Sequence, residues 1–342
     1  MLISKWFRRL LILATLVVIG VVWFLLQVFP IGGSGKEMVV TVHQGDSMAQ
    51  IASELHQAGV LSSPLAFRAE NLIFGAPLVR AGSYLIPQGA SYFSVKSIIG
   101  NLPNVNVINV VPGLSLHEIA IDAASDEGNS FADSFYSESL HNGAQFMAKF
   151  GFANAPSSLE GLIGPGQYIL LPNETPTELL NQMVKRFVAM AKQQGLTPTT
   201  EVRIGPRKTL DWYQLMTTAS IVQKEGYYTS NMGKVARVIW NRLNRGGSLQ
   251  MDSTVLYYYG ADGGKVTPQM LQTRTPYNTY LNSGLTPTPI CAVSSDALHY
   301  ALQPTPGPWL YFVVIDKNGD EAFSSTFAQQ LANERLAQQR GL

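Results

Sequence analysis

The sequence is poor in cysteine and in charged residues. Cys291 is the only cysteine among 342 residues, so no disulfide can form within the chain. Charged residues make up only 14% of the chain and hydrophobic residues 46%, which excludes a disordered polymer and allows a substantial core. A chain of this length can bury enough apolar surface to fold without disulfides, even outside the cell.

The usual signatures of metal, phosphate and serine chemistry are also missing. The histidines lie far apart and lack the spacing of metal ligands, at positions 43, 56, 117, 141 and 299. No phosphate-binding glycine motif and no serine-nucleophile motif occurs. Cys291 has no obvious histidine partner, so we interpret it as a small buried residue. We therefore expect neither a metal nor a cofactor.

One hydrophobic run is long enough to cross a membrane. Leu10 to Phe29 is uncharged, and a spanning helix needs about 20 such residues. Lys5, Arg8 and Arg9 precede the run, which places the N-terminus in the cytoplasm. A cleaved signal peptide is the alternative, but its apolar core is usually only about 7–15 residues long. We predict a retained single-pass anchor, with the chain after Pro30 outside the cytoplasm.

The exported part carries little net charge. It keeps 21 basic and all 23 acidic residues once the three N-terminal cations are set aside, so its charge is near −2. A nucleic-acid-binding protein would instead present a clustered basic surface, so we expect no nucleic-acid partner. The sequence GGSG at residues 32–35 predicts a short flexible tether after the anchor.

An internal repeat follows the tether. Residues 40–52 (VTVHQGDSMAQIA) and 108–120 (INVVPGLSLHEIA) share alternating apolar positions, a glycine, a serine and a closing Ile-Ala. This pattern predicts a short strand, a tight glycine turn and a capped helix. The capping residue would be Asp46 or Ser47 in the first copy and Ser115 in the second, and a weaker third copy starts at Leu85, with Gly89 and Ser91.

The first copy resembles a LysM carbohydrate-binding module. The stretch GDSMAQIA, from Gly45 to Ala52, is similar to the usual opening of that module. LysM modules bind N-acetylglucosamine polymers, which is what the resemblance implies here. A strand-turn-helix unit that binds nothing is the alternative, because a shared fold does not establish a binding site.

Two helices and a hairpin are predicted in the last third of the chain. Thr209 would cap a helix from Leu210 to Glu225, and Gly226 would end it in a left-handed conformation. Residues 309–315 (WLYFVVI) read as a buried strand that turns at Asn318 and Gly319 into a second strand. The apolar faces are Leu210, Tyr213, Met216, Ala219 and Val222 in the first helix, and Val235, Val238, Ile239 and Leu243 in a second helix that starts after Ser230.

Glu225 stands at the end of its helix, where the helix dipole disfavours negative charge. The ordinary interpretation is a solvated surface acid. The alternative is an acid that keeps its proton. Aromatic, amide and hydroxyl side chains dominate the segments that follow, and such side chains suit a sugar ligand.

Six motifs in order carry a second and more extensive resemblance. They are SIVQKE from Ser220, NRL from Asn241, LQMDSTVLY from Leu249, TPYNTY from Thr275, GLTPTPI from Gly284 and YFV from Tyr311. In order and spacing they resemble the endolytic murein (peptidoglycan) transglycosylases of the YceG-like family, MltG. With the anchor and the LysM-like unit, the resemblance covers nearly the whole chain.

Some positions depart from the family pattern. Gln223 stands where the family has a first Glu, and Gly226 where it has Thr. The segment EGLIGPGQY keeps the family's Glu and Tyr, as Glu160 and Tyr168. The family's Asn-Pro-Gly and a late His correspond here to residues 291–293 and to Glu321. These changes fall in loops around the expected cleft.

The resemblance implies cleavage of the β-1,4 bond between N-acetylmuramic acid and N-acetylglucosamine. Glu225 would be the general acid and then the base towards the sugar's own C6 hydroxyl, which leaves 1,6-anhydro ends and ends strand elongation. Sugar subsites would include Gln250, Asp252, Thr254, Tyr277, Asn278 and Tyr280. For the tyrosines a core position is the alternative, and for Gln250 and Asn278 a hydrogen bond to loop backbone.

Two other functions remain open. A hydrolase of the same bond would need a second carboxylate to activate water, and Asp252 is the candidate. A wall-binding scaffold would keep the fold without turnover. The resemblance implies glycan strands as substrate, peptidoglycan synthases as partners, and a bacterial inner-membrane location with a periplasmic catalytic domain.

The expected fold class is α+β, with a single N-terminal transmembrane helix, LysM-like strand-turn-helix modules and a mixed α+β catalytic domain. The predicted segments are a cytoplasmic tail (1–9), the transmembrane helix (10–29), a linker (30–36), the LysM-like module (37–105), a second α+β module or connector (106–200) and the catalytic domain (201–342).

Overall fold

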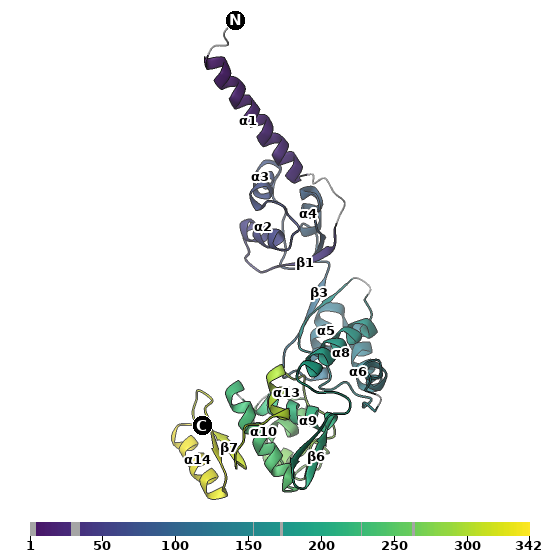
Figure 1. The fold of residues 1–342 in the computed structure, drawn as a ribbon, viewed down its shortest axis with the longest axis vertical. Helices are drawn as coiled ribbons and strands as arrows, with labels where there is room; N and C mark the ends of the chain where they lie inside the picture. The colour runs from purple at the N-terminus through teal and green to yellow at the C-terminus, as the bar shows by residue number, and fades with distance from the viewer. Residues whose placement is uncertain (1–4, 29–34, 153, 172–173, 227, 262–263) are drawn as a thin grey trace. The chain divides into compact units, whose positions relative to one another are not determined.

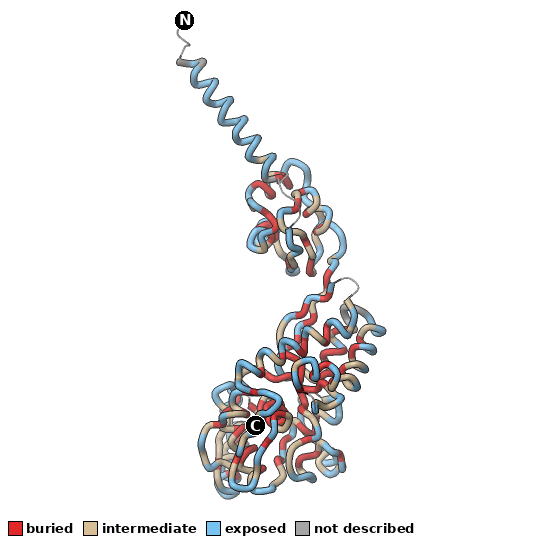
Figure 2. Tube along the Cα trace, turned by 45° about the vertical axis from the view of Figure 1, so that its right-hand side comes forward, coloured by how far each residue is buried: buried red, intermediate tan, exposed pale blue. Residues whose placement is uncertain are grey.

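The computed structural model describes residues 5–28, 35–152, 154–171, 174–226, 228–261 and 264–342. The chain divides into two compact units (Figure 1), the first formed by residues 1–107 and 169–173 and the second by residues 108–168 and 174–342. Buried residues gather inside each unit (Figure 2). The mixed α+β class is confirmed, and each sheet in the described residues has two strands. The six predicted segments stay a prediction.

The first unit combines a long apolar helix with a small α+β module. Residues Arg8–Leu26 of the helix are long and apolar enough to cross a membrane. Phe29 of the predicted transmembrane run and residues 32–34 of the predicted tether lie outside the described residues. The elements are α1 (Lys5–Val28), β1 (Glu37–Val42), α2 (Met48–Gln57), α3 (Pro64–Phe74), β2 (Gly82–Pro87) and α4 (Tyr92–Ile99).

The module is a two-stranded antiparallel sheet covered by helices. β1 pairs with β2 from Glu37 opposite Pro87 to Val42 opposite Gly82. One face of β1 is buried at Val40 and Val42, as strand alternation requires. Its core includes Leu55, Phe67, Tyr84, Tyr92 and Ile99, all nearly inaccessible to solvent.

The predicted repeats are confirmed as strand-turn-helix units. Gly45 and Gly113 have φ angles of 91° and 102°, a region that L side chains rarely adopt. Ser47 and Ser115 cap α2 and the helix of the second copy, each by a reciprocal capping box. Asp46 instead accepts a hydrogen bond from the His43 amide at 2.6 Å. The third copy is also present, with Gly89 at φ 69° and Ser91 as the cap of α4.

The second unit is mostly helical. Strands β3 (Asn106–Val110) and β4 (Gly166–Leu170) pair with each other. The remaining elements are α5 (Leu116–Glu127), α6 (Asn129–His141), α7 (Gly143–Ala148), α8 (Pro176–Gln193), β5 (Glu201–Gly205), β6 (Lys208–Asp211), α9 (Trp212–Glu225), α10 (Thr229–Asn244), α11 (Asp252–Tyr258), α12 (Pro268–Gln272), α13 (Ser295–Leu302), β7 (Tyr311–Val314), β8 (Glu321–Ser324) and α14 (Phe327–Gln339).

Three local predictions need correction. Thr209 lies in β6, which pairs with β5, so Asp211 rather than Thr209 caps α9. Gly226 has φ −81° and is not left-handed; a Cβ there would lie 2.7 Å from Met232 Cγ, so space selects glycine. The predicted β7–β8 hairpin is present, but β7 is only partly buried because its sheet has two strands.

Candidate functional site

Glu225 is the last residue of α9, a helix that packs against α10, α11 and α13. The Glu225 carboxyl is partly buried there. Its Oε1 accepts two hydrogen bonds from Ser253, from Oγ at 2.5 Å and from the backbone N–H at 3.2 Å. Ser253 is the second residue of α11, where backbone N–H groups have no acceptor within the helix. The end of one helix therefore meets the start of another at this carboxyl.

Opposing influences act on the pKa of Glu225, and burial outweighs the rest. Loss of hydration raises this pKa above its usual value of 4.5, and the negative charge of Asp252 raises it further. The two Ser253 hydrogen bonds and the Arg242 guanidinium lower it. The direction agrees with an acid that keeps its proton. The hydrogen bonds from Ser253 at the start of α11 lower this pKa, and the sequence did not predict them.

The same helix fixes a loop beside the acid. Ser220 Oγ accepts the Ile290 N–H at 3.0 Å, and Gln223 Oε1 accepts the Ser294 N–H at 2.9 Å. Gln223 thus serves as a neutral acceptor for the N-cap residue of α13. Cys291 is fully buried in this loop, as predicted.

Asp252 lies close enough to Glu225 to act on its pKa, and it pairs with Tyr280. Tyr280 Oη donates to Asp252 Oδ1 at 2.6 Å, and both burial and this carboxylate raise the pKa of the tyrosine. Gln250 is exposed and has φ 51°, the only positive φ outside glycine among the described residues. Backbone strain of this kind costs about 1–3 kcal/mol and is typical of functional sites.

Thr254 and Asn278 are buried and brace the loops around Asp252. Thr254 Oγ1 donates to the Met251 carbonyl at 2.7 Å. Asn278 Nδ2 donates to three carbonyls, the shortest bond being 2.8 Å to Thr273, and its Oδ1 accepts the Tyr280 N–H. These bonds match the alternative of loop bracing for Asn278. Sugar binding by the two side chains stays a prediction.

Tyr277 belongs to a neighbouring aromatic cluster around Glu160. Its ring lies 5.0 Å from that of Tyr257, whose Oη donates to Glu160 Oε2 at 2.9 Å. Glu160 also accepts the Leu116 N–H at the start of α5 and is 3% exposed. Burial raises the pKa of Glu160 to about 7. The sequence singled out Glu160, but it did not reveal that the residue connects α5 to α11.

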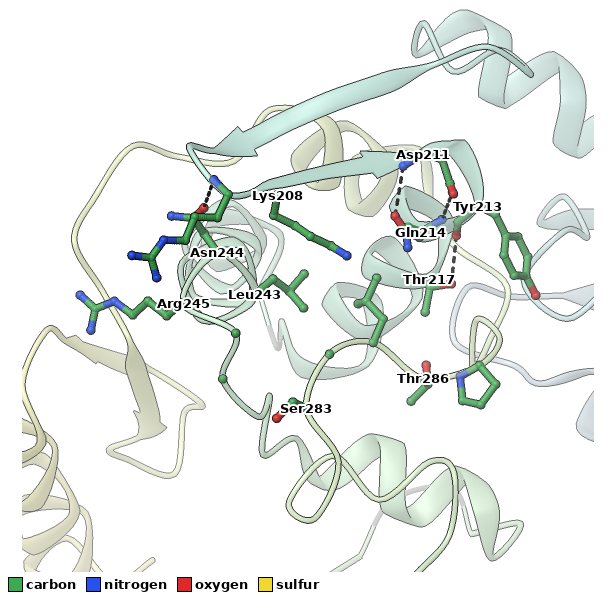
Figure 3. A pocket seen from close by; sticks show the side chains of 16 residues that line it. Lys208, Asp211, Tyr213, Gln214, Thr217, Leu243, Asn244, Arg245, Ser283 and Thr286 are labelled. Carbon is green, nitrogen blue, oxygen red and sulfur yellow. Dashed lines mark hydrogen bonds between the residues drawn. The ribbon is translucent and has the colours of Figure 1, made fainter.

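A cavity of about 650 Å³ opens at the other end of α9. Gln214 and Thr217 of α9 line it, and the Lys208 side chain points towards them (Figure 3). Arg207 and Arg245 also line the cavity, and no ion pair joins these three cations to another described residue. Gln214 and Glu225 are about 16 Å apart along the helix at 1.5 Å per residue. Asp211 also lines the cavity, so its lining carries three cations and one carboxylate and has an excess of positive charge. Gln214 in this lining lies about three helical turns from Glu225.

A cluster of one histidine and two carboxylates lies in the first unit, at the turn of the first repeat. His43, Asp46 and Glu54 bring their ligand atoms within 4.8 Å of one another. His43 Nδ1 lies 3.5 Å from Asp46 Oδ2 and 3.9 Å from Glu54 Oε1. The three residues are spread over 12 positions of the chain, without the close spacing typical of metal ligands, so this grouping was not predicted.

A sequence model of the YceG-like family matches residues 40–336. This chain belongs to the YceG-like family. The resemblance drawn from the six motifs is thereby confirmed, and it extends over both units.

Relatives of this YceG-like chain bear a consistent name. This chain is 28% identical over 312 residues to the endolytic murein transglycosylase of Bacillus subtilis strain 168. The match covers 88% of this chain and 85% of that protein. This chain is 27% identical to the protein of the same name from Streptococcus pneumoniae R6, covering 86% of this chain and 57% of that protein. The crystal structure of a YceG-like protein of Listeria monocytogenes aligns with a TM-score of 0.61 at 23% identity, over 86% of this chain and 98% of that one, and shows the shared fold.

Two residues that act on Glu225, Ser253 and Arg242, were not predicted from the sequence. Ser253 lies within the motif LQMDSTVLY, but nothing in the sequence distinguishes its hydroxyl as a partner of Glu225. Arg242 lies within NRL; its Nε donates to the Leu310 carbonyl at 2.6 Å, and its charge reaches Glu225. A signal for Ser253 could have come from the start of α11, since helix N-termini attract carboxylates.

Proposed function

We propose that this protein is a membrane-anchored endolytic transglycosylase. It cleaves the β-1,4 bond between N-acetylmuramic acid and N-acetylglucosamine in nascent glycan strands and leaves 1,6-anhydro ends. The observation that carries this proposal is Glu225, a partly buried acid whose environment favours the protonated form. The names of the Bacillus and Streptococcus relatives support the same activity.

The two oxygens of Glu225 have different tasks in this reaction. Oε1 is held by Ser253, which leaves Oε2 to carry the proton towards the glycosidic oxygen. As the bond to the anomeric carbon breaks, that proton moves to the leaving sugar. The Ser253 donors and the Arg242 charge stabilise the carboxylate that forms. The carboxylate then takes the proton of the C6 hydroxyl, whose oxygen closes the anhydro ring.

Asp252 supports the acid in this scheme without taking part in bond cleavage. Its negative charge raises the pKa of Glu225, and Tyr280 holds its Oδ1. Its closeness to Glu225 also favours a second candidate, a hydrolase in which Asp252 activates water. The products differ by one water, so their mass distinguishes the two reactions.

The cationic cavity suits acidic groups on the substrate. Peptide stems of peptidoglycan carry carboxylates, whereas the glycan backbone apart from its lactyl group is neutral. Lys208, Arg207 and Arg245 would attract such carboxylates at the far end of α9. The preferred substrate would then be a glycan that retains its peptides.

The first unit would hold the enzyme at the membrane. We assign α1 to the bacterial inner membrane with its basic N-terminal end in the cytoplasm, which follows the positive-inside rule. The proposal also includes three further features. They are a LysM-like module in the first unit, sugar contacts by Gln250, Tyr277 and Tyr280, and association with peptidoglycan synthases.

Mass spectrometry of digested peptidoglycan tests the activity. The full chain in detergent is compared with Glu225→Gln and with the matched surface variant Glu201→Gln. We expect anhydro-ended fragments from the native chain and from Glu201→Gln, and a loss of about 10²–10⁴-fold in Glu225→Gln. Hydrated ends would favour the hydrolase. Wall binding without any fragments would favour the scaffold.

A further inference from the structure

The module of the first unit exposes a group of large apolar side chains. Six of them are between 65% and 89% exposed: Leu65, Leu72, Ile73, Phe74, Leu78 and Phe93. We refer to these six residues as the apolar face. Five of the six lie in α3 or in the segment directly after it, and Phe74 shares a cavity with Phe93 of α4. Large apolar side chains exposed in such number usually mark a binding surface.

The local sequence keeps charge away from most of this face. Residues 71–79, NLIFGAPLV, contain no charged side chain. Glu70, just before them, is buried and paired with Lys96 at 3.1 Å. The apolar face is therefore suited to an apolar partner.

The apolar face adjoins the end of α1. Phe24, Leu25 and Val28 of α1 line a cavity of about 690 Å³ together with Phe74 and Phe93. Val28 is buried in the core of the module, and Phe24 packs against that core. Phe24 and Leu25 also lie inside the apolar segment Arg8–Leu26.

Helix length sets the depth at which this contact occurs. α1 has 24 residues. At 1.5 Å per residue it is about 36 Å long, slightly more than the roughly 30 Å hydrocarbon core of a bilayer. Its last turns therefore reach the boundary between acyl chains and headgroups. Side chains that surround Phe24 and Leu25 must lie at nearly the same depth.

We propose that the apolar face binds the outer surface of the membrane that α1 crosses, with its side chains among the acyl chains just below the headgroups. Shallow insertion of bulky apolar side chains is an established mode of membrane attachment. Continuity with the apolar segment of α1 favours lipid over a second protein as the occupant. This contact presupposes the membrane anchoring proposed above.

Site-specific fluorescence in the full chain tests the lipid contact. Cys291→Ala removes the native thiol, and single cysteines are introduced by Phe74→Cys, Leu72→Cys, Val17→Cys or Ser53→Cys. Each is labelled with an environment-sensitive fluorophore and reconstituted in phosphatidylethanolamine–phosphatidylglycerol vesicles. Brominated acyl chains serve as the quencher. Val17 reports on α1, and Ser53 is an exposed control in α2.

We expect labels at positions 74 and 72 to shift to shorter wavelength and to be quenched nearly as strongly as the label at 17, with position 53 unaffected. Quenching at 17 together with water-like emission at 74 and 72 would overturn the lipid contact and leave the anchor intact. A blue shift at 74 and 72 without lipid quenching would also overturn it and would indicate a protein partner. Absence of quenching at 17 would refute the anchor itself.

Discussion

Removal of the Ser253 hydroxyl should move the pH dependence of catalysis in a defined direction. Ser253 Oγ donates to Glu225 Oε1 at 2.5 Å, a bond that favours the ionised carboxylate. In Ser253→Ala the ionised form loses this support, so the pKa of Glu225 rises. An acid catalyst must be protonated, so the alkaline limb of the activity profile should move to higher pH.

The size of the shift follows from the strength of the bond. A hydrogen bond to a charged group contributes about 1.5–3 kcal/mol, and one pKa unit corresponds to about 1.4 kcal/mol. Because Glu225 keeps some contact with water, the lower end applies, which gives a shift of about one unit. Loss of the Ser253 hydrogen bond also destabilises the Glu225 carboxylate that forms during the reaction. We therefore expect kcat/KM at acidic pH to fall about tenfold.

The assay is kcat/KM against pH, with soluble glycan strands as substrate and anhydro ends as product. Ser253→Thr keeps a hydroxyl and should keep the alkaline limb of the native protein. If the alkaline limb of the Ser253→Ala profile is unchanged or moves to lower pH, Glu225 is not an acid catalyst whose pKa is lowered by the Ser253 hydrogen bond.

Three further changes have defined outcomes. Glu160 has a folded pKa of about 7 against an ordinary 4.5, so it binds its proton more tightly when folded, and native stability should fall by about 3 kcal/mol as pH rises through this interval. Urea unfolding near about pH 5 and about pH 8 should show this fall, and Glu160→Gln should lack it. Gly226→Thr should destabilise the protein by about 1–3 kcal/mol in urea unfolding because its Cβ meets Met232, and Met232→Ala should recover part of the loss. Lys208→Gln should raise KM about fivefold for peptide-bearing glycan and leave unchanged the KM for the same glycan with its stem carboxylates amidated, while the exposed Arg335→Gln changes neither.

Features set by a few neighbouring residues could be predicted from the sequence. The strand-turn-helix repeats depend on a left-handed glycine and a serine cap within a few positions of each other. Both residues can be recognised in the sequence. The apolar span of α1 is a property of composition alone. Glu225 was found because family motifs surround it.

Features that depend on distant contacts could not be predicted in this way. The start of α9 was misplaced because residues 201–211 pair with each other as a hairpin, which removes Thr209 from the helix. Ser253 reaches Glu225 across 28 positions, and Tyr257 reaches Glu160 across 97. Propensity and spacing carry no information about such contacts.

The attachment of α9 to the loop after Gly284 has a consequence for turnover. Because Ser220 and Gln223 bind the backbone of Ile290 and Ser294, that side of the site moves only if the helix bearing the acid moves too. The two Ser253 hydrogen bonds to Glu225 tie α11 to the end of the same helix. A glycan strand that displaces the end of α9 would therefore disturb the acid, the loop after Gly284 and α11 together.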